Sequence, residues 1–293
     1  MLVTKITHLS YKTFMPLSPS TTTALLEKLG HHPKKKLGQN FLIDGNIVDK
    51  SIRLSDLPSS GTVVEIGPGL GTLTRRLLEL GQSVHAVELD KTLAQNLNET
   101  EGQAIESGHL TITHADAVKK PLGSLPLTVF DYRIVANLPY AISSAWLESM
   151  LNTRKLPSRM VLMMQKEAVE RIWAKVGTKE FHALSIFISN AFVLTDKHPV
   201  SRKCFFPAPG VDSILIRMDL LESAYLFSEN TRNLIRRIFT QRRKQLGSLA
   251  KKENPTTCQT MLEWLDELKL SCTLRPEQVS SLDWKRLGQL MDN

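Results

Sequence analysis

Apolar and polar positions along the chain follow two different periods, and the two alternate. Five short runs are rich in apolar residues, as expected of strands in a buried sheet: 62–66, 83–88, 110–113, 132–136 and 159–164. Segments with the 3.6-residue period of an amphipathic helix lie among them, at 46–54, 72–80 and 144–151. Alternation of this kind predicts an α/β fold with a parallel, doubly wound sheet and helices on both faces.

The pattern changes after about residue 210. One more strand is predicted over 211–218, and three later segments have helical periodicity, at 231–249, 259–268 and 284–291. We therefore expect a larger domain over 34–220 and a small all-helical domain over 221–293. Residues 1–33 are rich in Ser and Thr but lack the Arg of a transit peptide, so we expect a disordered or weakly helical N-terminal extension.

Composition narrows the class of protein. The 293 residues are 42% hydrophobic and 23% charged, which suits one large and one smaller globular domain. The formal net charge of +8 favours a polyanionic partner. The three cysteines form no CxxC pair, so we expect reduced thiols in a cytoplasmic protein and no bound metal. No run of 18 apolar residues is present, so we expect no membrane-spanning helix.

Asn137, Leu138, Pro139 and Tyr140 form the most informative motif, directly after the strand predicted over 132–136. The exocyclic amine of adenine is a weak nucleophile because its lone pair is delocalised into the ring. The side-chain carbonyl of Asn137 and the backbone carbonyl of Leu138 can accept the two amine hydrogens, while Pro139 offers no N–H donor. Tyr140 can stack on a base taken out of its helix. The ordinary alternative is a strand followed by a Pro-containing turn.

A glycine-rich turn, Gly67, Gly69 and Gly71, lies between a predicted strand and a predicted helix, where it permits a close approach of a ligand. Its third glycine comes too early for a dinucleotide site. Glu88 ends the second strand, where a carboxylate can hold two ribose hydroxyls, and Asp116 follows the third, where it can accept from an adenine amine. These residues fit S-adenosylmethionine, unless Glu88 is a solvated carboxylate and Asp116 a helix cap.

Five segments in a fixed order now carry a family resemblance: 36–42, 65–71, 88–90, 137–140 and 205–213. From about residue 34 onward the chain resembles the KsgA-type ribosomal RNA adenine dimethyltransferases. The resemblance implies a Rossmann-like, S-adenosylmethionine-dependent methyltransferase domain with a small C-terminal helical domain. It also implies dimethylation of N6 of two adjacent adenosines, in a hairpin near the 3′ end of small-subunit ribosomal RNA, and a role in small-subunit biogenesis.

The same resemblance implies roles for individual residues. The expected cofactor contacts are Asn40, Leu42, Gly67, Glu88, Asp116 and Asn137. Tyr140 is expected to stack on the target base, with Phe205 as a second stacking partner. The chain departs from the family pattern at Leu37, where a basic or aromatic residue is common, and at Ala208, where a proline is frequent. Neither departure touches the expected chemistry.

A basic segment contains no acidic residue between Glu229 and Glu253. Its cations are expected on the outer side of one helix, opposite an apolar stripe. We expect five of them to contact RNA phosphates: Arg236, Arg237, Arg242, Arg243 and Lys244. A merely solvated helix face is the ordinary alternative.

We therefore predict a cytoplasmic, monomeric ribosomal RNA (adenine-N6,N6)-dimethyltransferase that uses S-adenosylmethionine. Its expected partner is small-subunit ribosomal RNA in a pre-30S-type particle, with no metal and no membrane involved. Two alternatives stay open at this point. One is a large-subunit adenine-N6 methyltransferase of the macrolide-resistance type, which shares the motif set. The other is a non-catalytic RNA-binding assembly factor, against which the intact run from Asn137 to Tyr140 argues.

Overall fold

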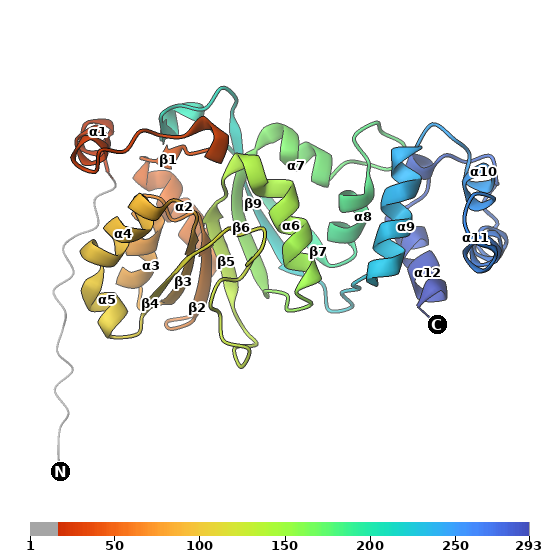
Figure 1. Cartoon of the computed structure of the whole chain (residues 1–293), viewed down its shortest axis with the longest axis horizontal. Coiled ribbons are helices and arrows are strands. Elements are labelled where there is room, and N and C mark those ends of the chain that lie inside the picture. Colours follow the sequence, from red (N-terminus) through yellow and green to blue (C-terminus); the bar gives the residue numbers. More distant parts are fainter. Residues whose placement is uncertain (1–16, 293) are drawn as a thin grey trace, which may run out of the picture.

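The structure is a computed structural model that describes residues 17–292. Its centre is a seven-stranded sheet in the order β4-β3-β2-β5-β6-β9-β7 (Figure 1). The parallel strands are β2 (Thr62–Ile66), β3 (Ser83–Glu88), β4 (Leu110–His114), β5 (Arg133–Asn137) and β6 (Arg159–Gln165). Two antiparallel strands complete the sheet, β9 (Ser213–Leu220) and β7 (Phe192–Val200). The predicted α/β fold is confirmed, with a mixed sheet in place of a wholly parallel one.

Strand β7 was not predicted, because only its end residues, Phe192 and Val200, are buried and the polar residues between them break the apolar run. The helices that cover the sheet are α2 (Gly45–Ser55), α3 (Thr72–Glu79), α4 (Lys91–Thr100), α5 (Gly102–Glu106), α6 (Ser143–Asn152) and α7 (Lys166–Ile172). The strand order reverses between β2 and β5, since β3 and β4 lie on one side of β2 and later strands on the other. A doubly wound sheet opens a ligand crevice at the carboxyl ends of such strands.

The chain beyond Leu220 is helical as far as it is described, with α9 (Glu229–Thr240), α10 (Leu246–Ala250), α11 (Pro255–Glu267) and α12 (Ser281–Met291). The single helix predicted over 231–249 is wrong, because α9 ends at Thr240 and a turn separates it from α10. The start of α10 bonds elsewhere: Leu246 N donates to Leu274 O at 2.8 Å and Gly247 N to Cys272 O at 2.9 Å. These tertiary bonds replace the helical ones that would have continued α9.

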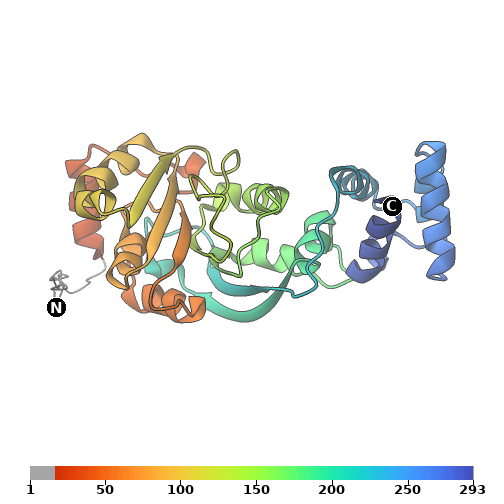
Figure 2. The same ribbon diagram turned by 90° about the horizontal axis from the view of Figure 1, so that it is seen from below.

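The C-terminal helices share a core with the sheet. Helix α8 (Ala183–Ser189) packs against α6 on one side and against α9 and α12 on the other. Trp264 and Trp284 stack inside the helical part with their ring centroids 5.1 Å apart. Figure 2 shows these helices at one end of an elongated molecule, with the first described residues, drawn in red, at the other.

The N-terminal extension is not disordered over residues 19–28, which form α1 (Pro19–Lys28). Ser18 caps the helix by accepting from Thr21 N at 3.2 Å, and Pro19 occupies the first helical position. Leu26 is buried against Phe41 and its apolar neighbours, which stabilises the helix. Of the two forms expected for the extension, this stretch takes the helical one, and residues 1–16 lie outside the described residues.

Candidate active site

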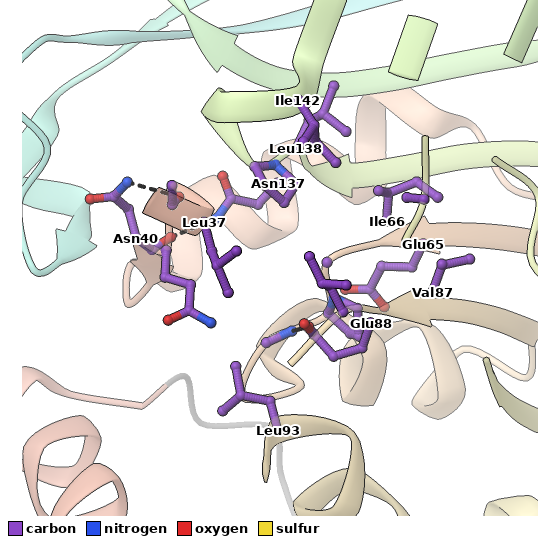
Figure 3. Close-up of a pocket in the computed structure, with 18 of the residues that line it drawn as sticks. Leu37, Asn40, Glu65, Ile66, Val87, Glu88, Leu93, Asn137, Leu138 and Ile142 are labelled. Carbon is purple, nitrogen blue, oxygen red and sulfur yellow. Dashed lines mark hydrogen bonds between the residues drawn. The ribbon is translucent and has the colours of Figure 1, made fainter. Parts of the chain in front are cut away.

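A cavity lies at the reversal point of the strand order, where the carboxyl ends of β2 and β5 diverge. Its walls contain every residue expected to contact a cofactor: Asn40, Leu42, Gly67, Glu88, Asp116 and Asn137. Leu138, Pro139 and Tyr140 line it as well. Figure 3 shows Asn40 and Asn137 on one side of the cavity and Glu65 and Glu88 on another. The topology therefore brings together motifs that the sequence spreads from residue 36 to residue 142.

Asn137 is the last residue of β5 and is half-buried. Its Nδ2 donates to the backbone carbonyl of Asn40 at 2.9 Å. A carbonyl oxygen only accepts, so this bond fixes which end of the amide is nitrogen. No described hydrogen bond uses Oδ1 of Asn137, and this acceptor is therefore free for a substrate amine.

The turn after β5 touches the glycine-rich turn after β2. Gly67 has φ of 66°, and a Cβ there would meet Pro139 Cγ at 2.7 Å. Only glycine combines this backbone conformation with such a close approach. Leu138 is buried, and its N–H donates to Met163 O at 3.1 Å on the neighbouring strand. The carbonyl-presenting turn is thus held by the sheet on one side and by Gly67 on the other.

Glu88 ends β3 and is buried, which raises the pKa of its carboxyl. Its Oε2 accepts from Gly69 N at 3.0 Å and its Oε1 from Asp90 N at 2.8 Å. A carboxylate has about four acceptor positions, so two stay available for ribose hydroxyls. Asp116 has the position of both a cavity residue and a cap. It lines the cavity, and its Oδ1 accepts from Val118 N at 2.9 Å.

Glu65 was not predicted as a site residue, but it lines the same cavity and is 2% exposed. Burial raises the pKa of its carboxyl to about 8, and Thr74 Oγ1 donates to Oε2 at 2.7 Å. The group is therefore mainly protonated at neutral pH and adds little negative charge to the cavity floor. Its position inside the 65–71 motif was visible in the sequence, but its burial was not.

A strap, residues 34–42, closes one side of the cavity and is tied at both ends. At its start, Lys34 Nζ contacts Asp90 Oδ2 at 2.7 Å, and Gln39 Oε1 accepts from Lys34 N at 2.8 Å. At its end, β1 (Phe41–Leu42) pairs with β8 (Phe205–Phe206). The Asn137 bond to Asn40 holds the middle of this strap.

The two aromatic residues expected to stack on a base are placed differently. Tyr140 lines the cavity, is half-buried, and its hydroxyl is hydrogen-bonded to Ser213 Oγ. Phe205 is 3% exposed, pairs with Leu42 and belongs to the hydrophobic core rather than the cavity wall. This placement contradicts the stacking role expected for Phe205, because a ring that the core covers presents no face to a base.

Most of the basic residues expected to bind RNA have partners within the protein. Arg236 Nε donates to Glu148 Oε1 at 2.7 Å, and Arg237 Nη2 to Glu253 Oε2 at 2.7 Å. Arg242 Nη2 donates to Thr178 O at 3.3 Å, and Glu277 lies 3.7 Å away.

Arg243 and Lys244 are exposed, as is Lys252. Lys244 and Lys252 share one acceptor, Gln241 Oε1, at 3.2 Å and 2.8 Å, and the Lys244 ammonium lowers the pKa of Lys252. The exposed cations therefore lie around the turn at the end of α9, and they do not form the continuous helix face that the sequence predicted.

Within residues 17–292, no group of three or more His, Cys, Asp or Glu side chains is arranged to hold a metal ion. In the same part of the chain, no helix is long and apolar enough to cross a membrane.

The fold and the site are those of a methyltransferase that modifies an amine. The sheet is Rossmann-like, the cavity at its switch point suits an adenosine-containing cofactor, and an asparagine acceptor lies beside it. The chain belongs to the ribosomal RNA adenine dimethylase family, whose model matches residues 30–281.

Known proteins with similar sequences and structures agree with this assignment. The chain is 46% identical to ribosomal RNA small subunit methyltransferase A of Opitutus terrae, over 93% of this chain and 98% of that protein. The protein of the same name from Staphylococcus haemolyticus is 33% identical, over 94% and 96% of the two chains.

Among solved structures, a dimethyladenosine transferase from Plasmodium falciparum has a TM-score of 0.68 and 28% identity, over 84% of this chain and 95% of that one. A 23S rRNA methyltransferase, ErmE, has a TM-score of 0.60 at 22% identity, over 87% of this chain and all of that one, and shares the fold.

Proposed function

We propose that this protein transfers methyl groups from S-adenosylmethionine to N6 of two adjacent adenosines of small-subunit ribosomal RNA, giving N6,N6-dimethyladenosine. The observation that carries the proposal is the Asn137 amide, whose nitrogen is committed to Asn40 O and whose oxygen is free beside the cavity. This arrangement recognises an amine donor. Membership of the ribosomal RNA adenine dimethylase family supplies the substrate class.

The cavity residues fit S-adenosylmethionine. Gly67 and Gly69 permit a close approach, Glu88 has acceptor positions for the ribose hydroxyls, and Asp116 has a carboxylate oxygen for the adenine amine. Asn40 and Leu42 would hold the cofactor from the side of the strap. When bound, the cofactor supplies an electrophilic methyl group on its sulfonium.

The residues of the turn after β5 prepare the nucleophile. In the first transfer Asn137 Oδ1 and the Leu138 carbonyl accept the two hydrogens of the adenine amine, and in the second one of them accepts the hydrogen that remains, which draws the nitrogen toward a tetrahedral shape and frees its lone pair. In each transfer the nitrogen gains the methyl group, the carbon–sulfur bond breaks to leave a neutral thioether, and the nitrogen releases one proton. Pro139 keeps donors out of this turn, and the Tyr140 ring stacks on the extruded base. Positioning of this kind contributes most of the rate acceleration in a displacement that needs no covalent enzyme intermediate.

The RNA backbone is proposed to cross the exposed cations near the end of α9. Figure 1 places the turn between α9 and α10 on the same side of the molecule as the carboxyl ends of the parallel strands, where β6 leads into α7. Arg243, Lys244 and Lys252 are exposed there and bind phosphates in this proposal, whereas the paired Arg236, Arg237 and Arg242 hold the helices in place.

We assign residues 34–220 to catalysis and 221–293 to RNA contact, and propose that the protein works as a monomer in the cytoplasm on a pre-30S-type particle. The large-subunit alternative is not favoured, since the relatives at 46% and 33% identity are small-subunit methyltransferases while ErmE is 22% identical and shares the fold. A purely non-catalytic role is also not favoured, because the cavity and its acceptor turn are intact.

The test uses purified small and large ribosomal subunits from cells that lack the gene. Incubation with the protein and methyl-labelled S-adenosylmethionine should label small-subunit RNA, and nuclease digestion should yield N6,N6-dimethyladenosine at two adjacent positions that block primer extension. Label in large-subunit RNA would support the rejected alternative. An absence of transfer to either subunit would overturn the proposal.

A further inference from the structure

Tyr140 is bonded to a residue that the sequence motif did not assign to any role. Its hydroxyl meets the hydroxyl of Ser213, and either group can donate. Ser213 is 1% exposed and is the first residue of β9. Its backbone lies between two strands, opposite Gln165 of β6 and Val200 of β7. The serine is therefore buried where β9 begins, with its backbone paired to a strand on each side.

The bond reaches Tyr140 from the end of the ring that is farthest from its own backbone. The backbone end is fixed as well: a Cβ at Gly38 would lie 3.0 Å from Tyr140 N, so the strap packs directly on this turn. A tyrosine ring has two side-chain torsions, and holding its hydroxyl restricts both. Burial raises the pKa of Tyr140, so its hydroxyl keeps the proton at neutral pH and can take part in the bond.

We propose that Ser213 is a positioning residue for the methyl acceptor: it acts through the Tyr140 hydroxyl to hold the ring in the orientation that stacks on the target adenine. The inference rests on the proposed function, since it requires a base at Tyr140. The 205–213 segment contributes no residue to the cavity wall, and Ser213 connects it to the site through the Tyr140 hydroxyl.

A purely structural serine would behave differently. It would satisfy a buried hydroxyl and stabilise β9, and its loss would lower the melting temperature without a specific effect on base stacking. A positioning serine works only while the Tyr140 hydroxyl is present. Its removal and the removal of that hydroxyl should therefore cause the same loss, and the two losses should not add.

The experiment is a double-mutant cycle on the full chain, with Ser213→Ala, Tyr140→Phe and the double variant. Methylation of small subunits is measured as kcat/KM at saturating S-adenosylmethionine. Each single variant should lose about two- to ten-fold, the range that one buried neutral hydrogen bond contributes, and the double variant should lose no more. Tyr140→Ala, which removes the stacking face, should lose at least about ten- to a hundred-fold.

Stacking itself is read from an RNA hairpin in which 2-aminopurine replaces the target adenine. Quenching of its fluorescence on binding should weaken in Ser213→Ala and Tyr140→Phe alike. Ser51→Ala is the matched control, because Ser51 is 3% exposed, its hydroxyl donates to Ile47 O at 2.9 Å, and α2 carries it outside the cavity wall. This control should lower the melting temperature without changing the quenching.

Two outcomes would overturn the inference: an unchanged kcat/KM in Ser213→Ala, or a double variant whose loss is the product of the two single losses. If Ser213→Ala does not fold, Tyr140→Phe removes the same bond from the half-buried partner, and unchanged quenching in that variant would overturn the inference by itself. Failure of the proposed function is distinct, because the wild-type protein would then leave small-subunit RNA unmethylated.

Discussion

Replacement of Asn137 tests the two hydrogen bonds assigned to its side chain, one to the strap and one to the substrate amine. Asn137→Ala removes the Oδ1 acceptor proposed for the adenine amine and also the Nδ2 bond to Asn40 O, which is 2.9 Å long. Losing one preorganised hydrogen-bonding group at a reacting centre costs roughly 10²–10³ in rate. Losing one neutral bond to the strap costs about 0.5–1.5 kcal/mol, or about two- to ten-fold in cofactor affinity.

Asn137→Asp is the informative companion, because it keeps an oxygen acceptor and replaces the Nδ2 donor to the strap with a charged oxygen that cannot donate to Asn40 O. We expect its kcat at saturating cofactor to lie well above that of Asn137→Ala, while its affinity for S-adenosylmethionine falls. Labelled methyl transfer to small subunits gives kcat, and isothermal titration calorimetry gives the dissociation constant. The fold should survive both changes, because the backbone of Asn137 stays paired with Met163.

Asn98→Ala serves as the control. Asn98 is exposed on α4, and its Nδ2 also donates to a backbone carbonyl, that of Ala94, at 2.8 Å. It should leave kcat and cofactor affinity unchanged. Loss of an oxyanion-type contact should lower the rate by roughly 10²–10³. The acceptor role is refuted if Asn137→Ala keeps more than about a third of the wild-type rate. Equal kcat values for the Ala and Asp variants would show that the oxygen is not what matters.

The remaining predictions concern charge. Arg243→Gln and Lys244→Gln should each lower the slope of log K for RNA against log salt by about 0.7–0.9, measured by titration at several salt concentrations. Arg154→Gln, an exposed arginine in the loop before β6, should leave this slope unchanged; a slope that no variant alters would place the RNA elsewhere. For Glu65, burial raises the pKa of the carboxyl from 4.5 to about 8 in the folded protein. The stability that the protonated carboxyl contributes is therefore fully present below the unfolded-state pKa, and it is lost as the pH rises through the folded-state pKa. Glu65→Gln should therefore gain stability relative to wild type between about pH 5 and about pH 8 in urea denaturation, and a constant difference would contradict the buried, protonated carboxyl.

The sequence by itself determined the fold class of this protein and the position of its site at one edge of the sheet. Apolar runs separated by amphipathic segments specify a parallel sheet, because strands joined by crossover helices must be buried on both faces. Motifs that end such strands necessarily meet at one edge. Gly67, Glu88, Asp116 and Asn137 could therefore be assigned to a common cavity before any coordinate was known.

Only the tertiary structure decided which groups are free to act. Arg236 is 88 positions from its partner Glu148, and Tyr140 is 73 from Ser213, so no local pattern reveals either pair. The basic segment was predicted to form one RNA-binding helix face. In the structure three of its arginines are bonded to groups of the protein, and the exposed cations lie in a turn, because Leu246 bonds to a distant loop instead of extending α9. Periodicity encodes which side of an element is buried, but the partner of a polar side chain depends on how the elements pack.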